Sequence, residues 1–325
     1  MKIPTLLTCL ALLAVAAVPA TQPDAAAGSA PGPAPEEPLK VIATLPTYGD
    51  LASEIGGDLV DVTVVCRPTQ DMHLVSITPS VMARVQHADM VLYTGLDAEP
   101  WLDPMLRGSG NFNILPGSAG SVAMSDGIPI KDVPDVLSRA QGDIHAYGNP
   151  HVWADPLAVR TMAATLRDAL SKARPEHAAE FEARCKAFTD RLTKALVGWL
   201  KDYGRLKGRK VVTYHPSWPY FLDRFGIGLA ATIEPKPRVA PTASHLQEVI
   251  DVMKSGGVSV IIREPFQDPD ATEFVRSATD ATVLELTTHP DGEQNGQAII
   301  DHFARNLAAV AAALDAAAPA EPKSP

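Results

Sequence analysis

Short apolar runs alternate with amphipathic stretches along most of this chain. In the first half, such runs predict buried strands at 41–45, 59–65, 89–93 and 113–115. Between them, apolar residues at helical spacing predict helices at 48–55, 80–87 and 98–106. Strands that alternate with helices indicate parallel βα units, because two parallel strands need a crossover connection.

The second half repeats this alternation. Strands are predicted at 210–214, 229–233, 258–262 and 282–286, and helices at 218–225, 244–255, 270–278 and 297–314. The pattern therefore predicts an α/β fold with two βα lobes, each with a mostly parallel four-stranded sheet.

Two helical stretches separate the halves, at 156–172 and 175–203. The second has one apolar stripe at steps of three and four residues, made by Phe181, Cys185, Phe188, Leu192, Leu196, Trp199 and Tyr203. At 1.5 Å per residue this helix is roughly 40 Å long, enough to join both lobes as a rigid strut. The alternative is a helix hairpin that packs on one lobe.

The ends of the chain differ in composition from its middle. Residues 1–20 have a basic start, an apolar core and the small-residue ending Val18-Pro19-Ala20, which predicts a cleaved signal peptide. Residues 21–38, rich in Ala and Pro, and the tail 315–325 are expected to be disordered. This leaves an N-terminal lobe at 39–173, a linking helix at 174–206 and a C-terminal lobe at 207–314.

Charge and cysteine content narrow the class of partner and the compartment. The 28 basic and 38 acidic residues give a net charge of −10, which argues against a nucleic-acid partner. No stretch after the signal is long enough to insert into a membrane, and Cys9 lies too early for a lipid anchor at the cleavage point. We expect a periplasmic monomer, in which Cys66 and Cys185 either pair or stay free.

Three histidines lie where predicted strands end. His73 follows the second predicted strand, His151 ends a long loop at 116–149, and His215 directly follows the strand at 210–214. Ligands in open α/β sheets bind beyond the carboxyl ends of the strands, so these residues predict a metal site. The other histidines are expected on solvated helix faces (His87, His177, His245 and His302) or in loops, as reserve ligands (His145 and His289).

Four segments resemble the metal-binding solute-binding proteins of zinc and manganese ABC importers, the cluster A-I or zinc-uptake component A type. They are Asp71-Met-His73 with Thr78-Pro-Ser80, Gly95-Leu-Asp-Ala-Glu-Pro-Trp-Leu102, Asn149-Pro-His-Val-Trp-Ala-Asp-Pro156, and Tyr214-His215 with Tyr220-Phe-Leu-Asp-Arg-Phe-Gly226. The resemblance implies that a metal ion is held between two lobes, by His73 and His151 from the first and His215 from the second.

The fourth ligand position is where the chain departs from that family. The family often has an Asp after the last strand of the second lobe, whereas this chain continues as Leu286-Thr-Thr-His-Pro-Asp-Gly292, and its loop 116–149 holds only His145. Glu264 follows a predicted strand directly, so it is a candidate ligand or an acceptor for a histidine N–H. A carboxylate paired with a nearby Arg or Lys is the alternative for Glu264, and Asp291, His289, His145 or water are the other candidates.

Three neutral imidazoles with a carboxylate or water suit Zn²⁺ in tetrahedral geometry, with Mn²⁺ as the alternative. Protons compete for the same imidazoles, so affinity is expected to fall below about pH 6.5. The expected function is to capture the ion and deliver it to an ABC-importer permease, with loop ordering more than lobe rotation. A metallochaperone or a metal-dependent adhesin is the alternative. A zinc hydrolase is disfavoured because the chain lacks His-Glu-x-x-His, Gly-x-Ser-x-Gly and P-loop motifs, so we expect no enzyme.

Overall fold

The computed structural model describes Met1 and residues 37–134 and 146–317. The described residues from Glu37 onward belong to one compact unit. The predicted signal peptide after Met1, nearly all of the Ala/Pro linker, most of the C-terminal tail and His145 lie outside the described residues.

The first sheet has four parallel strands in the order β2-β1-β3-β4. The strands are β1 (Leu39–Ala43), β2 (Val60–Val64), β3 (Met90–Tyr93) and β4 (Ser121–Ala123), and the helices between them are α1 (Pro46–Gly56), α2 (Pro79–Val85) and α3 (Leu102–Ser109). Proline stands at the start of α1 and α2, where its missing N–H costs nothing. Thr78 caps α2 by accepting a hydrogen bond from the Val81 N–H.

The predicted fourth strand at 113–115 is wrong. Phe112–Ile114 form a 3₁₀ helix (η2), and the fourth strand is β4, inside the stretch predicted as a loop. Gly120 allows the chain to enter β4, because a Cβ there would lie 2.3 Å from the Asp89 carbonyl oxygen. A strand of three residues is too short for its alternation to show in the sequence.

The second sheet is also parallel, in the order β6-β5-β7-β8. Its strands are β5 (Lys210–Thr213), β6 (Gly228–Thr232), β7 (Val260–Arg263) and β8 (Thr282–Glu285), and its helices are α6 (Pro219–Arg224), α7 (Ala243–Gly256), α8 (Pro269–Thr279) and α9 (Gly296–Ala316). A buried cluster that includes Val212, Ile261, Val249 and Val275 joins this sheet to α7 and α8. The predicted two-sheet α/β fold is confirmed.

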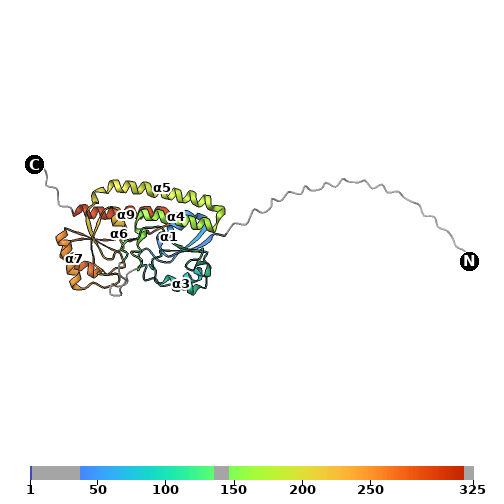
Figure 1. The fold of residues 1–325 in the computed structure, drawn as a ribbon, viewed down its shortest axis with the longest axis horizontal. Coiled ribbons are helices and arrows are strands. Elements are labelled where there is room, and N and C mark those ends of the chain that lie inside the picture. The colour runs from blue at the N-terminus through green and yellow to red at the C-terminus, as the bar shows by residue number, and fades with distance from the viewer. Residues whose placement is uncertain (2–36, 135–145, 318–325) are drawn as a thin grey trace. The chain divides into compact units, whose positions relative to one another are not determined.

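Long helices lie along both sheets. Figure 1 shows α5 (Ala178–Asp202) extending over the two sheets, beside α4 (Pro156–Ala173) and α9. The predicted apolar stripe of α5 is buried from Phe181 to Leu196, in a core that contains Val41 of the first sheet and Val211 of the second. The helix therefore joins both halves. Helix α9 also returns from the second half to pack on α1, which the sequence did not predict.

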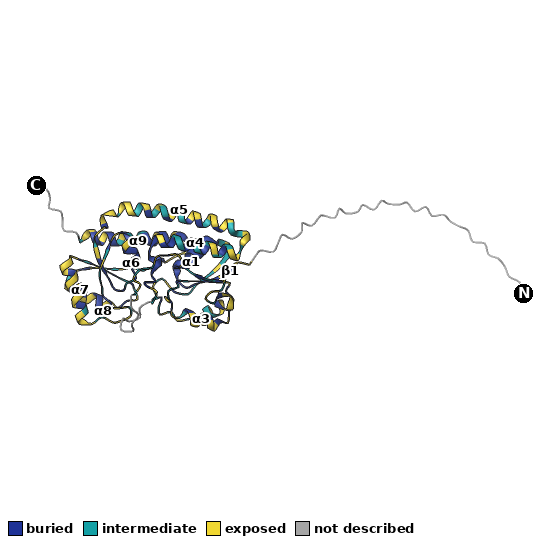
Figure 2. Cartoon of the chain, in the orientation of Figure 1, coloured by how far each residue is buried: buried dark blue, intermediate teal, exposed yellow. Residues whose placement is uncertain are grey.

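Buried residues occupy the sheets and the inner helix faces, and exposed positions follow the outer side of α5 (Figure 2). Both described cysteines are free thiols, and burial raises the pKa of Cys66 to about 12. The predicted solvated position of His302 is wrong: the ring is 3% exposed within α9. No helix in the described ranges has the length and apolar character that a membrane crossing requires.

Candidate metal centre

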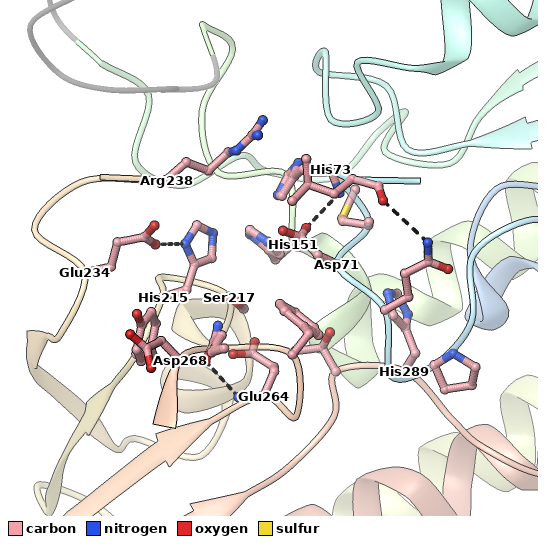
Figure 3. A pocket seen from close by; sticks show the side chains of 18 of the residues that line it. Asp71, His73, His151, His215, Ser217, Glu234, Arg238, Glu264, Asp268 and His289 are labelled. Carbon is pink, nitrogen blue, oxygen red and sulfur yellow. Dashed lines mark hydrogen bonds and ion pairs between the residues drawn. The ribbon is translucent and has the colours of Figure 1, made fainter. Parts of the chain in front are cut away.

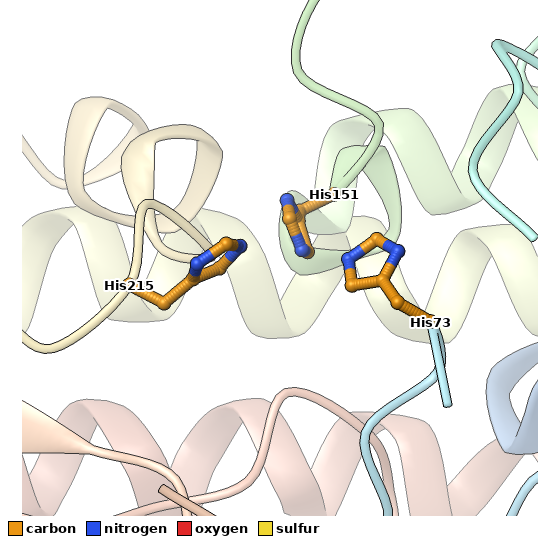
Figure 4. A group of neighbouring side chains, drawn as sticks. All are labelled: His73, His151 and His215. Carbon is orange, nitrogen blue, oxygen red and sulfur yellow. The ribbon is translucent and has the colours of Figure 1, made fainter. Parts of the chain in front are cut away.

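The three predicted histidines meet between the two sheets (Figure 4). One ring nitrogen of each lies within 4.8 Å of the others. The ring centroids are 5.3 Å apart for His151 and His215, 5.8 Å for His73 and His151, and 6.1 Å for His73 and His215. The strand-exit rule therefore identified side chains that converge from loops 78 and 64 residues apart in sequence.

Each of these rings has an oxygen atom next to its Nδ1. The distances are 2.9 Å from His73 to the Ala98 carbonyl, 2.8 Å from His151 to Asn149 Oδ1, and 2.5 Å from His215 to Glu234 Oε2. Because these oxygens accept hydrogen bonds, each ring donates from Nδ1 and carries its lone pair on Nε2. The hydrogen-bond network thus sets three imidazoles in the tautomer that binds a metal through Nε2.

The first lobe fixes the His73 loop through the Gly95–Leu102 segment. Trp101 Nε1 donates to the Met72 carbonyl at 2.7 Å, and the His73 N–H donates to Asp71 at 2.9 Å. The buried Glu99 carboxylate accepts three hydrogen bonds at 2.8 Å, from the Thr44 hydroxyl and from the amide and hydroxyl of Thr94. These contacts hold the turn whose Ala98 carbonyl orients His73.

Asn149 connects the loops of His151 and His215. Its Oδ1 also accepts from the His151 N–H at 3.1 Å, and its Nδ2 donates to the Pro216 carbonyl at 2.9 Å. The Tyr220 hydroxyl donates to the Asn149 carbonyl at 2.8 Å. The second and third histidines are therefore held by one network that crosses between the lobes.

Glu264 lies at the end of β7 and is 1% exposed. It lines the same cavity of about 280 Å³ as the three histidines (Figure 3). The pairing with an Arg or Lys is not found: its Oε2 is buried without a hydrogen-bond partner, and the neighbouring Arg263 pairs with Glu285. Burial raises the pKa of Glu264 to about 7, against the opposing effects of a Ser217 hydrogen bond and of nearby His215.

The reserve candidates differ in position. Asp291 is exposed, pairs with Arg305 and is not among the residues that line this cavity. His289 does line it, but its Nδ1 lies 3.2 Å from the Thr47 hydroxyl and its ring stacks on Trp153 at 4.8 Å. Burial lowers the pKa of His289 to about 3, so this ring is neutral.

Two residues of the site were missed from the sequence, Asn149 as a partner of His151 and Glu234 as a partner of His215. Glu234 directly follows the predicted strand 229–233. The rule that selected Glu264 would have selected it as well.

Comparison with known proteins gives a consistent result. The family model described as "Zinc-uptake complex component A periplasmic" matches residues 41–315. The "High-affinity zinc uptake system protein ZnuA" of Brucella abortus (strain 2308) is 26% identical over 277 residues, covering 73% of this chain and 79% of that protein. A "Putative metal-binding protein" of Thermotoga maritima is 23% identical over 275 residues, covering 84% and 92%.

Solved structures share the fold. A crystal structure of ZnuA superposes with a TM-score of 0.71 at 22% identity, covering 85% of this chain and 99% of that one. The solute-binding protein FpvC of Pseudomonas aeruginosa, in complex with Ni²⁺, gives 0.73 at 22% identity, covering 88% and 100%.

Proposed function

Because the chain belongs to the periplasmic zinc-uptake complex component A family, we propose that it captures a transition-metal ion and delivers it to an ABC-type membrane importer. Zinc is the proposed cargo, and manganese is the alternative. The observation that carries the proposal is the approach of three imidazole nitrogens, from two lobes, to within 4.8 Å of one another. Nitrogen ligands in this number favour zinc, since manganese prefers oxygen.

In this proposal His73, His151 and His215 bind the ion through Nε2, and Glu264 supplies the fourth ligand. A buried carboxylate with an oxygen lacking a hydrogen-bond partner is costly, and a bound cation would offset that cost. His289 is the weaker candidate, because Thr47 and Trp153 already engage its ring.

The test is metal analysis and chelator-competition titration of the purified protein. We expect one zinc ion per chain in the wild type, and loss of stoichiometric binding in His73→Ala, His151→Ala and His215→Ala. His87→Ala is the matched control, because His87 is exposed and does not line the cavity. Full occupancy in any one of the first three variants would remove that residue from the site.

We also propose that the chain acts as an exported monomer whose signal peptide, residues 1–20, is cleaved without lipid attachment. The lobe boundaries proposed are 39–173 and 207–314, with the linking helix at 174–206. Relatives in the comparison are named as uptake or metal-binding proteins, so we propose binding and no catalysis. N-terminal sequencing of the periplasmic protein tests the cleavage, and pull-down of a permease by the zinc-loaded protein tests the delivery.

Capture is proposed to order loops more than to rotate lobes. The Arg224 guanidinium donates to the Asp155 carboxylate at 2.8 and 2.6 Å, and Glu54 in α1 accepts from the Gly296 N–H at 2.9 Å, so the lobes are tied at two separate places. Hydrogen exchange should show zinc protecting the His73 loop while α5 stays protected in both states. Opening of α5 without zinc would contradict this.

A further inference from the structure

The three imidazoles of the site are backed by three different acceptors. His73 has a backbone carbonyl, His151 has a neutral amide, and His215 has the Glu234 carboxylate. The Nδ1–Oε2 distance of 2.5 Å for His215 and Glu234 is the shortest of the three, and each of these two side chains is 11% exposed. Figure 3 shows Glu234 on the far side of His215 from the other two histidines.

Adjacent strands fix both members of this pair. His215 and Glu234 each lie two residues beyond a strand end, after β5 and β6, which are neighbours in the sheet. The Glu234 N–H donates to the Tyr214 carbonyl at 2.9 Å. Thr213 donates to the His215 carbonyl at 2.8 Å, and Thr232 donates in the same way to the Glu234 carbonyl at 2.7 Å. The sheet itself therefore brings the carboxylate and the imidazole together.

A carboxylate that accepts from Nδ1–H does two things to an imidazole. It holds the ring orientation and tautomer, and it increases the electron density on Nε2, where a metal binds. A neutral amide or carbonyl holds the ring but adds no charge. Stronger nitrogen donation favours zinc more than manganese, because manganese depends more on oxygen ligands.

We propose that Glu234 is a positioning residue that acts through His215 to raise the zinc affinity of the site and its preference for zinc over manganese. This inference rests on the proposed function and concerns a residue that does not itself touch the ion.

The test compares Glu234→Gln with the wild type in competition titrations against zinc and manganese. Glutamine keeps an acceptor oxygen for His215 but removes the charge. We expect zinc affinity to fall about 10- to 100-fold and manganese affinity to fall less, so that the selectivity ratio narrows. Glu248→Gln is the control, because Glu248 lies 3.8 Å from His245 on α7 and its side chain is 72% exposed. We expect that control to leave both affinities unchanged.

A zinc affinity within about twofold of the wild type, or an equal loss for both metals, would overturn the inference. If the wild type itself binds no zinc, the proposed function fails. If the wild type binds zinc and Glu234→Gln binds it equally well, only the role of Glu234 fails.

The wild-type protein allows a second measurement that does not depend on a variant folding. In zinc-loaded protein labelled with ¹⁵N-histidine, the Nδ1–H proton of His215 should resonate furthest downfield of the three ligand rings, because a carboxylate accepts it. Three equal shifts would overturn the inference.

Discussion

Replacing Asn149 by alanine removes both the acceptor next to His151 Nδ1 and the donor to the Pro216 carbonyl beside His215. The distances lost are 2.8 Å to Nδ1 of His151, 3.1 Å to its N–H and 2.9 Å to the Pro216 oxygen. Asn149 is 7% exposed, so water replaces these contacts poorly. We therefore expect the substitution to loosen one ligand directly and another through its neighbour.

The magnitude follows from these contacts. A buried polar group left without its partner costs about 1–3 kcal/mol, which sets the expected loss of unfolding free energy at roughly 2 kcal/mol. Loss of a partner that orients a metal-binding histidine reduces metal affinity about 10- to 100-fold. That loss corresponds to roughly 1.4–2.7 kcal/mol of binding free energy.

Two measurements separate the effects: urea unfolding of the metal-free protein, and zinc titration against a competing chelator. Asn306→Ala is the matched control, because Asn306 is 6% exposed and contacts His302 and the Thr287 carbonyl, away from the cavity. It should lose similar stability but keep its zinc affinity. Asn149→Asp keeps an acceptor for His151 and should bind zinc better than Asn149→Ala. Wild-type zinc affinity in Asn149→Ala would refute this reasoning.

Three further outcomes are expected. Burial lowers the pKa of His302 to about 4, so its neutral form stabilises the fold above about pH 6.5, and that stability is lost as the pH falls towards 4, by at most about 1.4 kcal/mol per pH unit. His302→Gln should flatten this slope in urea unfolding, and an unchanged slope would count against it. Glu264 has the opposite sign: with its pKa raised to about 7, stability of the metal-free protein is full below about pH 4.5 and is lost as the pH rises to 7, a decline that Glu264→Gln should remove from the same unfolding series. Gly148→Ala should lower the thermal midpoint more than Gly110→Ala, because Gly148 has φ 99° and its Cβ would lie 2.6 Å from Ile130 Cγ2, whereas Gly110 has φ 71° and open space; equal midpoints would exclude the close contact as a cause.

The sequence located most strands but misplaced the weakest one. The segment 113–115 is apolar, and Ile114 is indeed fully buried, yet it is buried from a 3₁₀ turn. β4 is a strand because its three residues pair with β3, and pairing with a neighbour is not encoded in the alternation of three residues. Burial was therefore predictable at this position, whereas the type of element was not.

His302 is a case in which the sequence held the signal and it was not used. Ile299, Phe303 and Val310 mark the buried face of α9, and His302 and Asn306 lie on that face at helical spacing. A polar side chain was assigned to solvent by default. Its burial depends on a partner, Asn306 Nδ2 at 3.2 Å, one helical turn further along the same helix.

The candidate ligands were predictable because each follows a strand, but their oxygen partners depend on contacts between strands. Glu234 reaches His215 only because β6 lies next to β5. Asn149 reaches Pro216 across the two lobes, 67 residues away in sequence. A one-dimensional pattern gives the exits of strands, whereas the order of the strands in the sheet decides which exits are neighbours.

Strand order also bears on the fourth ligand. The family resemblance suggested an acid after the last strand, β8, but β7 lies between β5 and β8 in this sheet. Neighbouring strands are about 4.8 Å apart, so a carboxylate after β7 starts one spacing from the β5 exit that bears His215, and one after β8 starts two away. His215 thus has Glu234 after one neighbouring strand and Glu264 after the other. Moving the acid by one strand keeps it in the same crevice, which supports Glu264 as the proposed ligand although the β8 loop carries Thr288 and His289 instead.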